Sequence, residues 1–129
     1  MKREKCDILI VDDQLGVRSL LKTAFSEQGY SVETAANGEE GVEKVCEYCP
    51  KLILMDIKMP VKDGITALYE IKAQFPEVMV IMMTAYGEVE TIQRIKKGGA
   101  LDFFSKPFDL EVLLKYVDNL LQGEGAKLA

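Results

Sequence analysis

The chain has 129 residues, of which 48% are hydrophobic and 29% are charged, and its formal net charge is −5 at pH 7. This length suits one domain with its own hydrophobic core, and no apolar run approaches the ~20 residues of a transmembrane helix. The acidic balance, with no basic cluster beyond Lys96-Lys97, argues against nucleic-acid binding, and the lack of histidine excludes a histidine base or histidine-bound metal.

Apolar runs and amphipathic stripes alternate along the first third of the chain. The continuous run Ile8–Val11 predicts a buried strand, and the stripe that follows predicts a helix ending at Gly29. The stripe consists of Val17, Leu20, Leu21, Ala24 and Phe25. The stretch around Val32 alternates with polar residues, which is typical of a strand at a sheet edge, and Asn37-Gly38 opens a second helix.

The same alternation continues to the C-terminus. The sequence predicts a strand over Leu52–Met55, a helix between Asp63 and Pro76, a strand over Val78–Met83, a helix closed by Gly98-Gly99, a strand over Leu101–Ser105 and a helix capped by Asp109. The helix before Gly98 has a thin apolar stripe of Val89, Ile92 and Ile95, so we expect it to bury few contacts.

This order predicts a single α/β domain, a doubly wound (βα)₅ fold spanning residues 1–129 with a core of about 5–122 and no output domain. The first, third and fourth strands are the most apolar and therefore central. With right-handed crossovers the expected parallel strand order is 2-1-3-4-5, as in flavodoxin-like and receiver-like sheets.

Polar residues end four of the predicted strands. Asp12 and Asp13 follow the first strand, Asp56 ends the third, Thr84 follows the fourth and Lys106 follows the fifth. Ligands of open parallel sheets bind at the carboxyl ends of the strands, next to the point where the strand order reverses. Carboxylates that meet there repel by roughly 3–4 kcal/mol per ionised pair at an effective dielectric near 20. A hard divalent cation would offset this repulsion, so the sequence predicts an acidic metal pocket.

Each of these residues also has a structural interpretation. Asp12 or Asp13 could simply cap a helix, Thr84 could start a turn, and Lys106 could be a solvated loop charge. The combination favours a site, because four strand ends converge with complementary charge.

The three cysteines do not predict a redox or metal centre. Cys46 and Cys49 form a C-x-x-C pair, but they fall at helical spacing with Val42 and Val45, so we expect both thiols on a buried helix stripe. The charged N-terminus meets Cys6-Asp7 instead of the apolar region of a signal peptide. We therefore expect reduced thiols and a cytoplasmic protein with no membrane partner.

The motifs around these strand ends resemble the receiver domains of two-component response regulators, from about Lys5 to Leu121. The matching motifs are Ile-Leu-Ile-Val-Asp12-Asp13, Met55-Asp56-Ile57-Lys58-Met59-Pro60 with Asp63-Gly64, Met83-Thr84-Ala85, and Lys106-Pro107-Phe108. The segments Asp12-Asp13-Gln14, Ala35-Ala36-Asn37-Gly38 and Thr84-Ala85-Tyr86-Gly87-Glu88 are most similar to the single-domain receiver of the sporulation phosphorelay.

The resemblance implies a role for each site residue. Asp56 would accept a phosphoryl group from a phosphohistidine. Mg²⁺, with Mn²⁺ or Ca²⁺ as substitutes, would be held by Asp13, Asp56 and the Lys58 carbonyl, with Asp12 acting directly or through water. Lys106, whose peptide bond to Pro107 would be cis, would bind one phosphoryl oxygen, and Thr84 would bind another.

Further residues would govern switching, lifetime and docking. Phe103 would reorient with Thr84, although it could equally be ordinary core. Lys58 and Tyr86 would shield the acyl phosphate from water and give slow self-hydrolysis. Leu15, on the side of the first helix opposite the stripe, would dock a partner's helical bundle. Gly16, Pro60, Tyr86 and Phe108 would join Leu15 in this partner surface, although Leu15 could also be a scattered surface residue.

The resemblance implies a signalling protein that is not an enzyme. It would take a phosphoryl group from a histidine kinase and pass it to a histidine phosphotransferase, with a phosphatase as a further candidate partner. The alternative is a stand-alone regulator that binds an effector when phosphorylated. An aspartate phosphatase would need Asp at position 14, which is Gln. A flavodoxin would need a phosphate loop where this chain has carboxylates.

Overall fold

The computed structural model describes residues 5–85 and 89–128, and its side chains up to residue 123 apart from residue 89. The elements are β1 (Ile8–Val11), α1 (Leu15–Glu27), β2 (Val32–Ala35), α2 (Gly38–Tyr48), β3 (Leu52–Asp56), α3 (Gly64–Gln74), β4 (Met79–Thr84), α4 (Val89–Lys97), β5 (Asp102–Ser105) and α5 (Leu110–Leu128). The strict alternation of strand and helix in the described residues agrees with the predicted (βα)₅ order.

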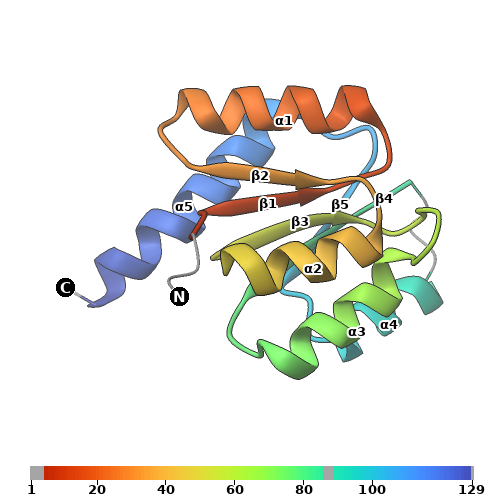
Figure 1. Cartoon of the computed structure of the whole chain (residues 1–129). Helices are drawn as coiled ribbons and strands as arrows, with labels where there is room; N and C mark the ends of the chain where they lie inside the picture. The colour runs from red at the N-terminus through yellow and green to blue at the C-terminus, as the bar shows by residue number, and fades with distance from the viewer. Residues whose placement is uncertain (1–4, 86–88, 129) are drawn as a thin grey trace.

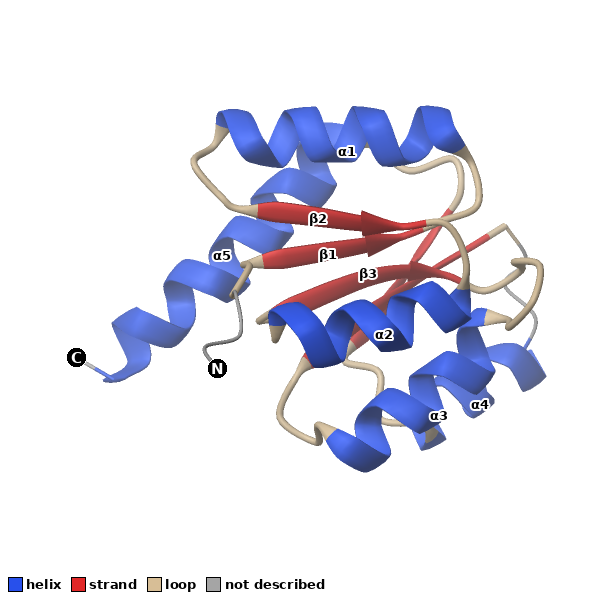
Figure 2. Cartoon of the chain, in the orientation of Figure 1, coloured by secondary structure: helices blue, strands red, loops and turns tan. Residues whose placement is uncertain are grey.

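The five strands form one parallel sheet in the order β2-β1-β3-β4-β5, which confirms the predicted topology. Helices α1 and α5 cover one face, and α2, α3 and α4 cover the other (Figures 1 and 2). All strands point the same way, so the loops that follow them gather at one edge of the sheet. The reversal of strand order lies between β1 and β3, where the sequence placed it.

Alternate side chains of the central strands pack on opposite faces of the sheet. Leu9, Ile53 and Val80 belong to a core cluster with Leu68 and Ile71 of α3. A second cluster packs the intervening strand residues against α1 and α5; among its members are Ile8, Leu54, Ile81, Phe25 and Leu113. Because both faces are covered, the strands are apolar without interruption rather than alternating with polar residues.

Within the part of the chain that the structure describes, three helices begin with a side-chain cap. The side chain of Asn37 accepts a hydrogen bond from the Glu40 amide (2.9 Å) at α2. Asp63 accepts one from the Thr66 amide (2.8 Å) at α3, and Asp109 accepts one from the amide of Val112 (3.1 Å) at α5. These caps confirm the predicted starts of the three helices, because each satisfies an amide that has no partner within its own helix.

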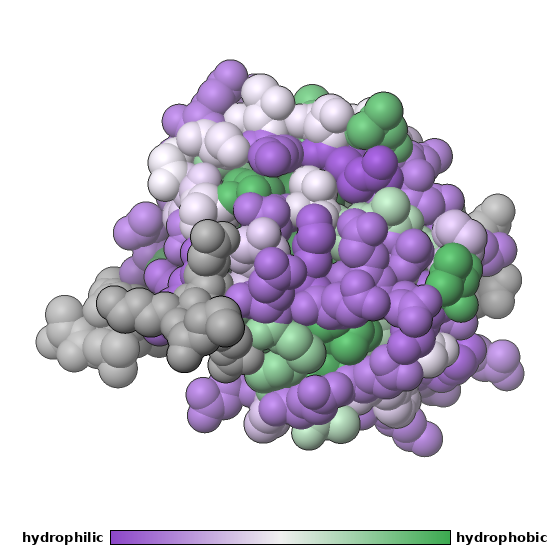
Figure 3. Space-filling view, viewed as in Figure 1, coloured by the Kyte–Doolittle hydropathy of each residue, from purple (hydrophilic) through white to green (hydrophobic). Residues whose placement is uncertain are grey.

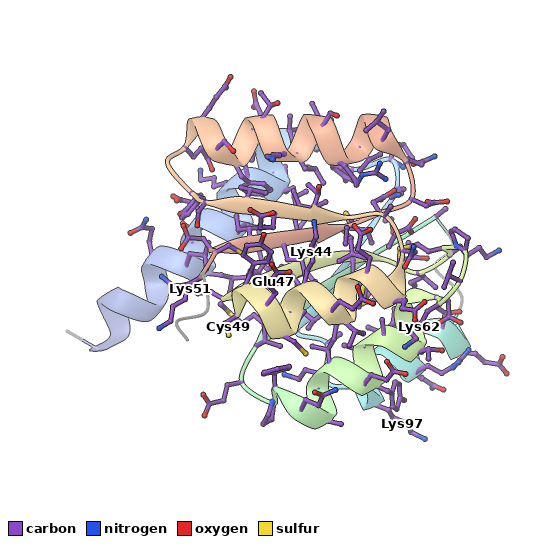
Figure 4. All side chains as sticks on the ribbon, in the orientation of Figure 1. Lys44, Glu47, Cys49, Lys51, Lys62 and Lys97 are labelled. Carbon is purple, nitrogen blue, oxygen red and sulfur yellow. The ribbon has the colours of Figure 1, made fainter. Side chains whose placement is uncertain are left out.

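Two side-chain predictions were wrong. Leu20 was expected on the buried stripe of α1 but is 49% exposed, because the core contact of this helix is made by Leu21 and Phe25. Cys46 and Cys49 were expected to be buried, but both are only half-buried. Of that stripe, Val45 reaches the core, while Cys49 lies at the C-terminal cap of α2, at the end of the sheet opposite the loops that follow the strands (Figure 4).

Smaller differences concern strand ends and thiols. The fourth strand runs from Met79 to Thr84 rather than from Val78, and the fifth begins at Asp102. None of Cys6, Cys46 and Cys49, all within the described residues, forms a disulfide. No described helix is long and apolar enough to cross a membrane. Figure 3 shows that hydrophilic residues cover most of the face seen there, with hydrophobic residues in small separate patches.

Candidate functional site

Three polar residues are buried at the carboxyl ends of neighbouring strands. Asp12 follows β1 and is fully buried, Asp56 ends β3 with 8% exposure, and Thr84 ends β4 with 3% exposure. The sheet ladder continues into this edge: the Asp12 amide donates to the Ala35 carbonyl (3.0 Å), and the Lys106 amide donates to the Thr84 carbonyl (2.7 Å). The sheet itself therefore brings residues from four strand ends together, as the sequence predicted.

A lysine joins the two buried carboxylates. The Lys106 ammonium donates to Asp12 Oδ2 at 2.7 Å and lies 3.4 Å from Asp56 Oδ2. The other oxygen of each carboxylate accepts a backbone amide: Gln14 N–H reaches Asp12 Oδ1 (2.9 Å), and Ile57 N–H reaches Asp56 Oδ1 (2.8 Å). Asp12 is therefore not the N-cap of α1, which is Gln14; its carboxylate makes a local turn contact and also faces the site.

The electrostatics of Asp56 and Lys106 follow from this crowding. Burial raises the pKa of Asp56, and the neighbouring Asp12 carboxylate raises it further, against the opposing effect of Lys106. Burial works to lower the pKa of Lys106, but the Asp12 and Asp56 carboxylates together outweigh it, and the pKa is raised. Lys106 is therefore held in its charged form, whereas the ionised form of Asp56 is disfavoured.

The acidic cluster suits a hard cation. Carboxylate oxygens of Asp12, Asp13 and Asp56 all lie within 4.8 Å of one another. Asp13 is exposed, while the other two carboxylates are buried. The Lys106 ammonium pairs with Asp12 and Asp56 but offsets only one of the three negative charges, and an oxygen-ligated divalent ion would neutralise more, so these residues fit the predicted Mg²⁺ site.

A cavity of about 510 Å³ opens at this edge of the sheet, and its buried lining residues, Asp56 and Thr84, form its floor. Predicted site residues Asp13, Asp56, Lys58, Thr84 and Lys106 line it. Four further lining residues were not assigned a role from the sequence: Gln14, Ile57, Ala85 and Thr91. Gln14, Ile57 and Ala85 each adjoin a predicted residue in the chain. Thr91 has no such signal, because only the packing of α4 brings it to the site.

The loop between β3 and α3 fixes the backbone of Asp56. A Cβ atom built on Gly64 would lie 1.9 Å from the Asp56 carbonyl oxygen, so only glycine fits there. In the same loop Val61 has a φ of 69° and is 75% exposed. A β-branched residue is strained in this left-handed region, and the Lys62 amide closes the turn onto the Pro60 carbonyl (2.7 Å).

The residues predicted for docking differ in exposure. Leu15 is 68% exposed, which confirms its predicted orientation away from the core. Gly16 and Pro60 are also not buried, whereas Phe108 is half-buried and packs against the core cluster of the α1 and α5 face. Tyr86 lies outside the described residues.

The predicted switching and tuning residues lie around the same edge. Phe103 is half-buried and packs against the core cluster beneath α2, α3 and α4. Lys58 is exposed at the cavity, and the Lys106-Pro107 peptide bond is cis, as expected.

Residues 8–118 match the family model of the response regulator receiver domain. Sporulation initiation phosphotransferase F of Bacillus subtilis is 45% identical over 94% of this chain and 96% of its own length. Chemotaxis protein CheY of Bacillus subtilis is 40% identical over 88% of this chain and 96% of its own length. Regulatory protein AtoC of Escherichia coli is 44% identical, but the chain spans only 26% of that relative.

Solved structures agree with these sequence matches. A CheY-like response regulator receiver domain protein from Methanospirillum hungatei superposes with a TM-score of 0.88 at 29% identity, over 98% of this chain and 99% of the other. Chemotaxis protein CheY4 of Vibrio cholerae superposes with a TM-score of 0.83 at 31% identity, over 89% of this chain and 98% of the other.

Proposed function

Since the chain belongs to the response regulator receiver domain family of two-component systems, we propose that it accepts a phosphoryl group on Asp56 and passes it on in a phosphorelay. The observation that carries this proposal is the Lys106 ammonium between the carboxylates of Asp12 and Asp56, with Lys106 and Asp56 lining the cavity. A nucleophilic carboxylate, a fixed cation and two further acidic ligands are the components that phosphoryl transfer to aspartate requires.

Asp56 is the nucleophile. Its Oδ1 is occupied by the Ile57 amide, which leaves Oδ2, the oxygen nearer Lys106, to attack phosphorus. The donor's phosphorus–nitrogen bond breaks as the Asp56 oxygen–phosphorus bond forms, and the electron pair leaves with the imidazole. The pKa of Asp56 is raised, so positive charge beside Asp56 is needed to favour the ionised carboxylate that attacks phosphorus.

Asp13 and Asp56, with the Lys58 carbonyl, would hold Mg²⁺, and Asp12 would act directly or through water. Bound there, the ion supplies charge neutralisation for the carboxylates and the transferred phosphoryl group. Lys106 pairs with a phosphoryl oxygen as a point charge, for which its raised pKa keeps it protonated. Thr84, at the end of β4, offers a hydroxyl to a second oxygen.

Relaying implies two successive protein partners, a histidine kinase as donor and a histidine phosphotransferase as acceptor. The similarity to Sporulation initiation phosphotransferase F along almost its full length supports this role. Leu15, Gly16 and Pro60 beside the cavity would contact both partners and any phosphatase. Phe103 would change orientation as Thr84 moves toward the phosphoryl group, and Lys58 and Tyr86 would slow hydrolysis.

A stand-alone regulator that binds an effector is the second candidate, because the chain is also similar to Chemotaxis protein CheY along almost its full length. Both functions need the same phosphoacceptor pocket, but only a relay returns the phosphoryl group to a histidine. The two are therefore separated by onward transfer and not by labelling.

The test begins with labelling by radioactive acetyl phosphate and Mg²⁺. Wild type should gain acid-stable, alkali-labile label that Asp56→Asn lacks, whereas Asp63→Asn, a carboxylate change at the cap of α3, should label normally. Labelled protein is then mixed with a histidine phosphotransferase. Label appearing on the phosphotransferase supports the relay, and label that stays on Asp56 with every phosphotransferase tried favours the stand-alone regulator.

A further inference from the structure

The wall of the cavity on the α4 side carries a hydroxyl that the proposed transfer does not use. Thr91 of α4 lines the same cavity as Asp56, and Gln14, the N-cap of α1, lines it as well. Both side chains are neutral and can donate and accept hydrogen bonds. They differ in this respect from the charged side chains that line the same cavity, which are Asp13, Asp56, Lys58 and Lys106.

Helix α4 is anchored through its second half. Ile95 is buried, and Tyr69 Oη donates to the Arg94 carbonyl (3.1 Å). Gly98, directly after the helix, lies so close to Leu68 that a Cβ atom built on it would be 2.7 Å from that side chain. In the first half, Thr91 and Ile92 are only half-buried. The Thr91 side chain is therefore held by a packed helix but is not enclosed, so water in the cavity can reach it.

Hydrolysis of phosphorylated Asp56 needs water on the open side of this cavity. The attacking oxygen must approach phosphorus in line with the bond to Asp56, on the side away from that carboxylate. The buried floor formed by Asp56 and Thr84 cannot admit it. The approach therefore lies among the lining residues that are not buried, and of these Gln14 and Thr91 offer neutral side-chain hydrogen-bonding groups.

We propose that Thr91 is a positioning residue whose hydroxyl, with the Gln14 amide, hydrogen-bonds the water that hydrolyses phosphorylated Asp56, so that α4 helps to set the lifetime of the phosphoryl group. This inference rests on the proposed function, since it needs phosphorylated Asp56. In the step, the water oxygen bonds to phosphorus and the phosphorus–oxygen bond to Asp56 breaks. The bonding pair returns to the carboxylate, and both water protons leave with the inorganic phosphate.

The test follows the loss of label from protein loaded with radioactive acetyl phosphate and freed of the donor, with each decay normalised to its own starting label. Thr91→Val keeps the shape but removes the hydroxyl, and it should slow the decay about three- to tenfold, as expected for one lost hydrogen bond to the reacting water. Thr91→Ser restores the hydroxyl and should return the rate to within about twofold of wild type. Gln14→Met should slow the decay as well.

Thr66→Val is the matched control, because it removes a hydroxyl from an exposed position in the first turn of α3, outside this cavity. Its decay should match that of wild type. Wild-type decay in Thr91→Val, or decay in Thr91→Ser as slow as in Thr91→Val, would overturn the inference while leaving the proposed function intact. Absence of label on wild-type Asp56 would overturn both.

Discussion

The Lys106 ammonium donates to the fully buried carboxylate of Asp12 at 2.7 Å, which joins two residues 94 positions apart in the chain. The pair ties the end of β5 to the end of β1 across the carboxyl edge of the sheet, with Asp56 between them at 3.4 Å from the same ammonium. It is a contact of the fold as well as of the site, so its removal affects both stability and phosphorylation.

Lys106→Met should lower the free energy of unfolding by roughly 2–4 kcal/mol, because it leaves the buried Asp12 charge without its partner. Lys62→Met is the control: its partner Glu70 is 2.6 Å away, but both side chains are partly exposed, and the expected loss is less than about 1 kcal/mol. Urea denaturation in a chelating buffer measures both. Equal losses in the two variants would contradict a special role for the buried pair.

Asp56→Asn should stabilise the metal-free protein at neutral pH. The folded-state pKa of Asp56 is raised by burial and by Asp12, so this side chain binds more protons in the native state than in the unfolded chain in the interval above the unfolded pKa. The contribution of Asp56 to the free energy of unfolding therefore falls as pH rises through that interval, and the variant escapes this loss. Melting temperatures from about pH 4 to about pH 8 in a chelator should diverge in favour of the variant as pH rises. Parallel curves would show that Asp56 has no raised pKa.

Mg²⁺ should raise the free energy of unfolding of the wild type, by about 2.7 kcal/mol at a concentration near 100 times its Kd. Asp13→Asn should lose most of this gain, because it removes the exposed carboxylate of the acidic cluster. Asp63→Asn should keep it, since an asparagine side chain at the same position can still cap α3. Thermal unfolding with and without Mg²⁺ gives the comparison, and equal gains in all three proteins would argue against this cation site.

Gly64→Ala should cost more than about 2 kcal/mol and reduce labelling of Asp56, because the new Cβ would meet the Asp56 carbonyl oxygen at 1.9 Å. Gly16→Ala makes the same change where nothing lies within 4 Å. In the first turn of α1 it should be neutral or stabilise by up to about 1 kcal/mol. Chemical denaturation and acetyl phosphate labelling test the pair, and normal labelling of Gly64→Ala would contradict the importance of this close approach.

Val61→Gly should stabilise the protein by up to about 1 kcal/mol. The reason is that the backbone strain of a β-branched residue in the left-handed region is relieved, and this gain exceeds the free-energy cost of the conformational entropy that glycine adds to the unfolded chain. Val112→Gly, at another exposed valine but within α5, should destabilise by about 0.5 kcal/mol or more. Opposite signs in urea denaturation are the expected result. Destabilisation of Val61→Gly would mean that the loop does not store this strain.

Much of the fold was predictable from the sequence because its signals are local. The continuous apolar runs of β1, β3 and β4, the capping residues Asn37, Asp63 and Asp109, and the polar residues at the strand ends each act within a few positions of the chain. The rule that parallel strands share one carboxyl edge then brought Asp12, Asp56, Thr84 and Lys106 together without further information.

Other features depended on tertiary packing. Leu20 fits the periodicity of α1 but lies at the margin of the helix face that contacts the sheet, so it is exposed. Thr91 carries no motif and reaches the cavity only because Ile95 and Gly98 seat α4 against its neighbours. The amino-acid order by itself determined the strands, their arrangement and the acidic pocket, because local pattern and sheet chirality are sufficient for these. The three-dimensional packing decided which helix residues face the core or the cavity, since that depends on how each helix lies on its neighbours.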